Sequence, residues 1–154
     1  MNTQFRAETV DRILKEYRGR EFAWGRADCV RAARRLLVAL GAKGLPRMTD
    51  IRYSSERTAL RRLKEQGHDS LESLLSTYCT EIPVAWALPG DLGTIRGDSS
   101  LSAITVCAGP AWLGWTAESP DFSVLTLTPE RVFRLAETDK ERAYTQAMRE
   151  AARV

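Results

Sequence analysis

The sequence is poor in the residues that build metal sites and disulfide frameworks. It has one histidine, His68, and three widely spaced cysteines, Cys29, Cys79 and Cys107. There is no CxxC pair and no cluster of cysteine with histidine, so neither a disulfide framework nor a zinc site is supported. We therefore expect no metal and no cofactor, and we expect Cys79 and Cys107 to be small core residues.

Several other signals are absent as well. No apolar run approaches the roughly 20 residues that span a bilayer. The first residues lack the basic segment followed by an apolar segment that marks a signal peptide. The sequence therefore predicts no membrane anchor and synthesis in a reducing cytoplasm. It also contains no phosphate-binding loop, dinucleotide fingerprint or serine elbow.

The net charge of +3 conceals an uneven distribution of charge. Residues 1–66 hold 16 Lys and Arg against 8 Asp and Glu, whereas residues 67–154 hold 7 against 12. A basic half can bind nucleic acid, but no groove-reading motif or aromatic stacking platform accompanies it. Solvated helix faces, or docking on an acidic neighbour, explain the basic half better than nucleic-acid binding does.

The most informative stretch is Phe22-Ala-Trp-Gly-Arg-Ala-Asp-Cys29 with the apolar segment that follows it. An aromatic–glycine turn leads into Asp28, a good N-cap, and the apolar helix after it ends at Gly41. Cys29 therefore lies in the first turn of a helix. Unpaired N–H groups and the helix macrodipole favour a thiolate there, so a cysteine nucleophile would be placed at this position.

Periodicity and turn residues predict an α+β fold with its helices before its strands. Helices are expected over residues 4–18, 28–40, from Ser54 or Ser55 to about Gln66, and from a capping box at Asp69-Ser-Leu-Glu72. Short antiparallel strands are expected over 92–95, 101–108, 111–116, 124–127 and 131–135, with Ser119-Pro-Asp121 as a loop. The cysteine helix would pack on one face of this sheet.

A last helix is expected over residues 139–153, with a capping box at Thr138-Asp-Lys-Glu141. We divide the chain into a domain over 1–136 and a helical extension over 137–154. The extension has a thin apolar stripe that includes Tyr144 and Met148, and either docking on a partner or packing on the sheet would cover it. Trp112 and Trp115 are read either as interface aromatics or as core. The interface candidates are therefore Trp112, Trp115, Tyr144 and Met148.

Several motifs resemble known families. A cysteine that opens a central helix ahead of an antiparallel sheet resembles papain-like peptidases. The segment from Trp24 to Cys29 resembles the Gly-x-x-Asp-Cys segment of NlpC-type cell-wall hydrolases, and Pro89-Gly-Asp-Leu92 resembles their Gly-Asp turn. A closer resemblance, over about residues 5–136, is to an uncharacterised family of small phage and prophage proteins encoded among tail genes. It adds Arg52-Tyr53 and Phe133-Arg-Leu135 to the shared motifs.

The resemblance implies a degenerate active site. NlpC-type enzymes use a cysteine, a histidine and a third polar residue, and their histidine lies about six residues before a glycine. Counting back from Gly109 reaches Ala103, with Ser102 beside it, and neither can act as a base. His68 falls in a predicted loop between two helices, which makes it an unlikely base. Cys29 is thus a vestigial residue or a weak candidate nucleophile.

Three hypotheses about function follow, in order of preference. The first is a non-enzymatic component of a bacteriophage tail tip, located in the virion and contacting hub, distal tail or tape-measure proteins. The second is an active peptidoglycan-cleaving cysteine peptidase or amidase that uses Cys29. The third is a tail assembly chaperone that leaves before maturation.

Overall fold

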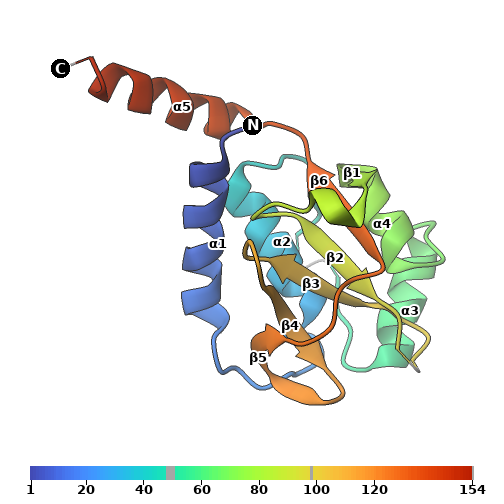
Figure 1. The fold of residues 1–154 in the computed structure, drawn as a ribbon. Coiled ribbons are helices and arrows are strands. Elements are labelled where there is room, and N and C mark those ends of the chain that lie inside the picture. Colours follow the sequence, from blue (N-terminus) through green and yellow to red (C-terminus); the bar gives the residue numbers. More distant parts are fainter. Residues whose placement is uncertain (48–50, 98, 154) are drawn as a thin grey trace.

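The computed structural model describes residues 1–47, 51–97 and 99–153, and it shows the predicted order of helices before strands (Figure 1). The first two helices, α1 (Thr3–Tyr17) and α2 (Cys29–Leu40), each begin at a side-chain cap. Asn2 accepts a hydrogen bond from the backbone N–H of Phe5, and Asp28 caps α2 as expected. α2 ends at Gly41, whose φ of 103° is the left-handed conformation that glycine adopts readily.

Two shorter helices follow, α3 (Glu56–Glu65) and α4 (Leu71–Tyr78). Ser55 caps α3 in a capping box with Thr58, which confirms one of the two expected caps. The cap of α4 is Ser70, which accepts from the backbone N–H of Ser73 at 3.0 Å. The prediction that Asp69 caps this helix is therefore wrong by one residue, because either side chain can serve as an N-cap.

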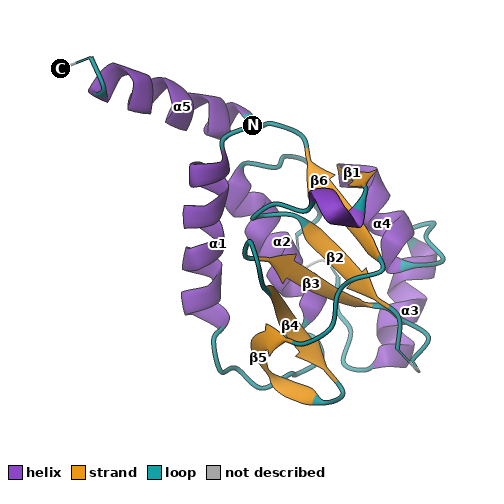
Figure 2. Cartoon of the chain, in the orientation of Figure 1, coloured by secondary structure: helices purple, strands orange, loops and turns teal. Residues whose placement is uncertain are grey.

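In the described part of the chain, six strands form one antiparallel sheet in the order β1-β6-β2-β3-β4-β5 (Figure 2). They are β1 (Cys79–Ile82), β2 (Leu92–Ile95), β3 (Ala103–Cys107), β4 (Trp112–Thr116), β5 (Ser119–Leu125) and β6 (Arg131–Leu135). Every neighbouring pair is antiparallel. The structure thus confirms an α+β fold with an antiparallel sheet.

The two edge strands differ from the predictions. β1 was not predicted, because it follows α4 directly and is defined by its pairing with β6, more than fifty residues later in the sequence. β5 includes Ser119-Pro-Asp121, which was predicted to be a loop. Pro120 is tolerated there because an edge strand can lack a backbone donor. Its carbonyl oxygen accepts a hydrogen bond from the N–H of Phe22, so the chain around Phe22 borders this edge.

The helices cover one face of the sheet. Residues such as Leu36 of α2, Ile104 of β3 and Phe133 of β6 share the main core between helices and sheet. The opposite face carries a smaller apolar cluster of Cys107, Trp112 and Val132. A short 3-10 turn, η2 (Val84–Trp86), contributes Val84 to this second cluster. Cys79 and Cys107 are both buried, as expected.

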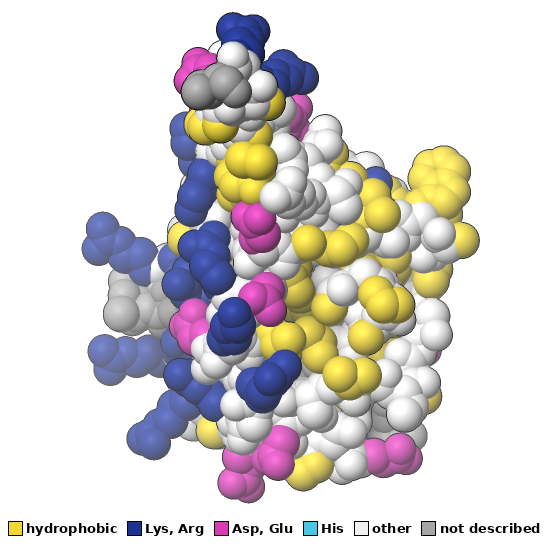
Figure 3. Space-filling view, turned by 60° about the vertical axis from the view of Figure 1, so that its left-hand side comes forward, with side chains coloured by type: hydrophobic (Ala, Val, Ile, Leu, Met, Phe, Trp, Pro, Cys, Tyr) yellow, Lys and Arg dark blue, Asp and Glu magenta, His cyan; other side chains and the backbone are white. Residues whose placement is uncertain are grey.

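The last helix, α5 (Asp139–Ala151), packs against the start of α1 and projects away from the sheet (Figure 1). Packing on the sheet, one of the two expectations for this segment, is therefore wrong. Figure 3 shows the helix as an arm at the top of the molecule. No helix among the described residues is both long and apolar enough to cross a membrane.

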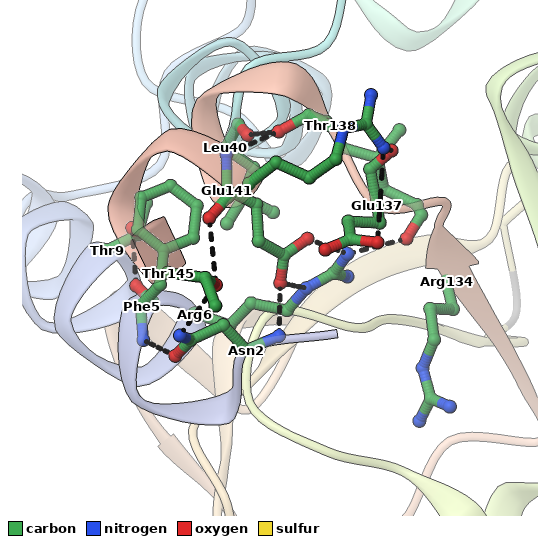
Figure 4. A network of polar contacts seen from close by, with 12 residues as sticks. Asn2, Phe5, Arg6, Thr9, Leu40, Arg134, Glu137, Thr138, Glu141 and Thr145 are labelled. Carbon is green, nitrogen blue, oxygen red and sulfur yellow. Dashed lines mark hydrogen bonds and ion pairs between the residues drawn. The ribbon is translucent and has the colours of Figure 1, made fainter. Parts of the chain in front are cut away.

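A buried polar network fastens the start of α5 to the domain (Figure 4). Glu141 accepts hydrogen bonds from Arg6 Nε at 2.9 Å and Arg6 Nη2 at 2.8 Å, and both side chains are only 1% exposed. The backbone N–H of Asn2 donates to the same carboxylate at 2.7 Å. The hydroxyl of Thr138, which caps α5, donates to the carbonyl oxygen of Leu40 at the end of α2. Two helices are thus tied to the base of the arm.

Candidate functional site

The candidate site is organised around Asp28, which immediately precedes Cys29. Its carboxylate accepts hydrogen bonds of 2.9 Å from the backbone N–H groups of Gly25 and Arg31. The hydroxyl of Tyr53 donates to it, also at 2.9 Å. Asp28 is 1% exposed, so this carboxylate is engaged by the turn, the helix and the loop before α3. It serves as a structural cap, as the sequence predicted.

The aromatic turn before α2 has a packing role. Phe22 and Trp24 are in edge-to-face contact with ring centroids 5.0 Å apart, and Phe22 also contacts Trp115. Gly25 has a φ of 75°, and a Cβ added there would lie 2.2 Å from the carbonyl oxygen of Tyr53. Only glycine fits this backbone conformation and this close approach. The turn thus brings the segment from Trp24 to Cys29 into contact with Arg52-Tyr53, and the family resemblance names these two segments as separate motifs.

A cavity of about 760 Å³ lies beside Cys29. α2, α3, α4 and the ends of strands β2, β3 and β4 contribute to its lining, which is mainly aliphatic and aromatic. Cys29, Ser102 and Ala103 all line it, and the backbone of Ile104 is among the groups that act to lower the pKa of the Cys29 thiol. The cysteine therefore faces the start of β3, where the resemblance places a histidine and this chain has Ala103.

The electrostatics at Cys29 differ from the expectation of a thiolate. Burial raises the pKa of the Cys29 thiol from 9.0 to about 12, and the negative charge of Asp28 adds to this rise. Backbone hydrogen bonds act in the opposite direction but are outweighed. The residue Cys29 as a whole is half-buried, but the cavity that the thiol faces is apolar, so a charged sulfur would be poorly solvated. The helix terminus favours a thiolate, but desolvation is the larger effect and raises the pKa of the thiol.

His68 is not brought to this site. It lies in the loop between α3 and α4, as predicted, and its Nδ1 is 2.9 Å from the hydroxyl oxygen of Ser73. Unlike Cys29, it is not part of the cavity lining. Since a cysteine peptidase needs a base within hydrogen-bond reach of the thiol, His68 does not complete a catalytic pair.

A second pair of motifs meets on the other side of the sheet. Arg134 of β6 forms two hydrogen bonds with Asp91, of 3.0 Å from Nε and 2.8 Å from Nη2. Asp91 is completely buried and also accepts from the backbone N–H of Leu88. Arg134 further donates to the carbonyl oxygen of Trp86. The Gly-Asp turn and the closing strand are therefore one structural unit that fixes the loop before β2.

The interface candidates separate into two groups. Trp112 and Trp115 are 9% and 3% exposed, and the indole N–H of Trp115 donates to the carbonyl oxygen of Arg20. They are core residues, which corrects their assignment to an interface. Tyr144 packs on Phe5 at the base of α5. Met148 is 44% exposed, so of the four candidates it offers the largest fraction of its surface to a partner.

Sequence reasoning missed the contributions of the middle helices and of Tyr53. α3 and α4 supply one wall of the cavity, and their half-apolar faces do not reveal this in the sequence. Tyr53 could have been suspected from the family motif, although nothing local links it to Asp28. Among the described residues, the structure contains no group of three or more His, Cys, Asp or Glu side chains that could hold a metal ion.

We expect Cys29 to be alkylated slowly. In a Cys79→Ala/Cys107→Ala variant, its reaction with iodoacetamide at pH 8 should be at least about a hundredfold slower than that of free cysteine, because a pKa near 12 leaves almost no thiolate. The rate should still rise with pH above 9. Mass spectrometry over a pH series measures it. A rate plateau near pH 7 would contradict the buried, uncharged thiol.

The comparisons with known proteins are informative at the level of family. A family model described as Domain of unknown function (DUF6950) matches residues 3–135. The chain therefore belongs to this family. The match ends at the last residue of β6, so α5 lies beyond it. No curated protein and no solved structure matches the chain.

Proposed function

We propose that this protein is a non-enzymatic component of a bacteriophage tail tip, built on a degenerate NlpC-like domain. The order of elements supports the NlpC-like relationship, since a cysteine opens a central helix that packs on an antiparallel sheet. The motif similarities over Trp24–Cys29 and Pro89–Leu92 support it further. The proposed location is the virion, after synthesis in the host cytoplasm.

The main support for a non-enzymatic role is the chemistry around Cys29. The thiol is uncharged at neutral pH, and Ala103 stands where a histidine is expected. Cleavage of a peptide bond needs a group that removes the thiol proton and later protonates the leaving amine. The ionisable side chains of the cavity include no histidine, and Asp28 is already engaged by Tyr53 and two backbone N–H groups. A thiol alone gives poor amide hydrolysis.

The arm formed by α5 supports a role in assembly. Its first turn is fixed by buried polar contacts, whereas the residues from 146 to 153 are exposed. A helix anchored at one end can present its free end to a neighbouring protein without loss of the domain's own packing. Hub, distal tail and tape-measure proteins are the proposed neighbours, and the basic helices of the first half offer a further contact surface.

A zymogram tests the absence of enzymatic activity. We expect neither the wild-type protein nor its Cys29→Ala variant to clear a peptidoglycan gel, because no base serves the thiol. The size of the cavity at Cys29 favours the peptidase or amidase hypothesis as the second candidate. Clearing by the wild type that is lost in Cys29→Ala would establish that alternative and overturn our choice.

The proposed location has its own test. We expect mass spectrometry of purified virions to detect the chain in fixed copy number with the tail-tip proteins. A protein found in infected cells but absent from mature particles would instead be an assembly chaperone, the third hypothesis. Absence from both tail complexes and virions would refute the tail assignment.

A further inference from the structure

The cavity beside Cys29 is larger than folding alone requires. Protein interiors are packed nearly as densely as organic crystals, and few voids exceed the size of a water molecule. A volume of about 760 Å³ falls within the range of small-molecule sites, roughly 300–1,000 Å³. The inner wall is formed by apolar side chains of four elements, including Leu37, Leu75, Ile95 and Trp115. Water finds few hydrogen-bond partners on such a wall, so an apolar ligand would occupy the cavity more favourably.

The polar groups around Cys29 present little unbalanced charge to a bound molecule. The Cys29 thiol is neutral at physiological pH because its pKa is raised by burial. The Asp28 carboxylate receives hydrogen bonds from Tyr53 and from the turn, and Arg31 lies 3.9 Å from it. The interior thus suits the uncharged body of a ligand.

Charged side chains at the cavity rim are distributed unevenly among the elements. Arg34 comes from α2, Arg62 from α3 and Arg96 from the segment after β2, while Glu21 and Glu118 come from the turn before α2 and the hairpin between β4 and β5. Arg34 Nε donates to the carbonyl oxygen of Pro46, and Arg62 Nε donates to that of Arg52. These bonds hold both guanidinium groups in place. Arg62 Nη1 is also paired with the Glu65 carboxylate at 2.9 Å. The bond from Arg34 to Pro46 uses Nε alone, and the terminal N–H groups of a guanidinium suit a carboxylate. Arg34 therefore gives the α2 side of the rim a cationic end.

We propose that this cavity binds a small single-chain amphiphile, with its apolar chain along the Cys29 wall and an anionic head at Arg34. A medium-chain carboxylate is the simplest molecule of this class. The binding is non-covalent and needs no activity of Cys29. This proposal goes beyond the tail-tip function and does not depend on it.

Isothermal titration calorimetry with the full chain tests the proposal. Sodium decanoate below its micelle concentration should bind with one-to-one stoichiometry and a Kd below about 0.1 mM. Butyrate has six fewer methylene groups and should bind at least about a hundredfold more weakly. Decyltrimethylammonium has an alkyl chain one carbon longer but a cationic head, and it should bind at least about tenfold more weakly than decanoate. Fluorescence of Trp24 and Trp115, which line the cavity, gives an independent readout.

Two variants locate the site. Ala59→Trp places an indole in the cavity wall of α3 and should abolish decanoate binding, whereas Ala147→Trp on the exposed part of α5 should leave it unchanged. Arg34→Gln should weaken decanoate binding about tenfold and leave the weak decyltrimethylammonium binding unchanged or stronger. Urea unfolding of each variant confirms that it folds.

Four outcomes would overturn the proposal. The first is that decanoate fails to bind the wild-type protein, and the second is that it binds equally to Ala59→Trp. The third is equal affinity for decanoate and decyltrimethylammonium, which would remove the role of Arg34. Tighter binding of the peptide acetyl-Leu-Leu-Leu-Glu than of decanoate would reassign the cavity to a peptide segment.

Discussion

Replacing Glu141 by leucine should lower the free energy of unfolding by about 3–5 kcal/mol, because it leaves the buried Arg6 guanidinium without its counter-charge. Arg6→Met should have an effect of similar size, since it leaves the buried Glu141 carboxylate without its counter-charge. The double variant Arg6→Met/Glu141→Leu should recover most of the loss, because two apolar side chains replace two matched charges. Urea denaturation followed by circular dichroism measures all three.

A matched control is available at the same end of α5. Lys43 and Asp139 form an ion pair of 3.2 Å in which both side chains are largely exposed. Lys43→Ala should change the free energy of unfolding by less than about 0.5 kcal/mol, because solvent screens exposed pairs. A loss in Glu141→Leu no larger than in Lys43→Ala would show that α5 does not dock on α1 in solution.

The same pair predicts a pH dependence. Burial would raise the pKa of Glu141, but hydrogen bonds from Arg6 and Asn2 outweigh it and hold that pKa below its usual value of 4.5. A carboxylate with a depressed pKa in the folded state stabilises the protein above its unfolded pKa. This contribution is lost as the pH falls through the folded-state value. As the pH is lowered, the free energy of unfolding should therefore fall less steeply in the double variant than in the wild type.

Replacing Asp28 by alanine should lower the free energy of unfolding by about 3 kcal/mol. The change removes the N-cap of α2 and leaves the N–H of Gly25 and the hydroxyl of Tyr53 without their acceptor. It should also lower the pKa of Cys29 from about 12, because one cause of the rise is the charge of Asp28. The alkylation rate of Cys29 against pH measures this second effect.

Ser70→Ala is the matched control for the cap alone. Ser70 caps α4 through a hydrogen bond from Ser73 N, and its loss should cost about 1 kcal/mol. Asp28→Ala should lower the free energy of unfolding by more than Ser70→Ala does. This difference measures the contribution of the hydrogen bonds that Asp28 accepts from Gly25 and Tyr53. Tyr53→Phe should account for about 1 kcal/mol of that excess. Equal costs for the two cap variants would mean that Asp28 acts only as a helix cap.

Local signals in the sequence determined the helices and most of the strands. Asp28 and Gly41 bound α2 because an N-cap and a left-handed C-terminal glycine act within a few residues. Ser55 and Thr138 identify two further helix starts for the same reason. Strands β2, β3, β4 and β6 stand out because turn residues separate short apolar runs. The absence of a histidine near Ala103, the main argument against catalysis, is also a property of the sequence alone.

Only the tertiary structure decided the environment of those residues. β1 exists because its backbone pairs with β6, and no local pattern contains that partner. The burial of Trp112 and Trp115, the direction of α5 and the pairing of Arg6 with Glu141 each depend on contacts between segments far apart in the chain. The Cys29 thiol shows the reason most clearly. The helix terminus that favours its ionisation is encoded locally, whereas the stronger desolvation comes from the cavity walls that distant elements build around it.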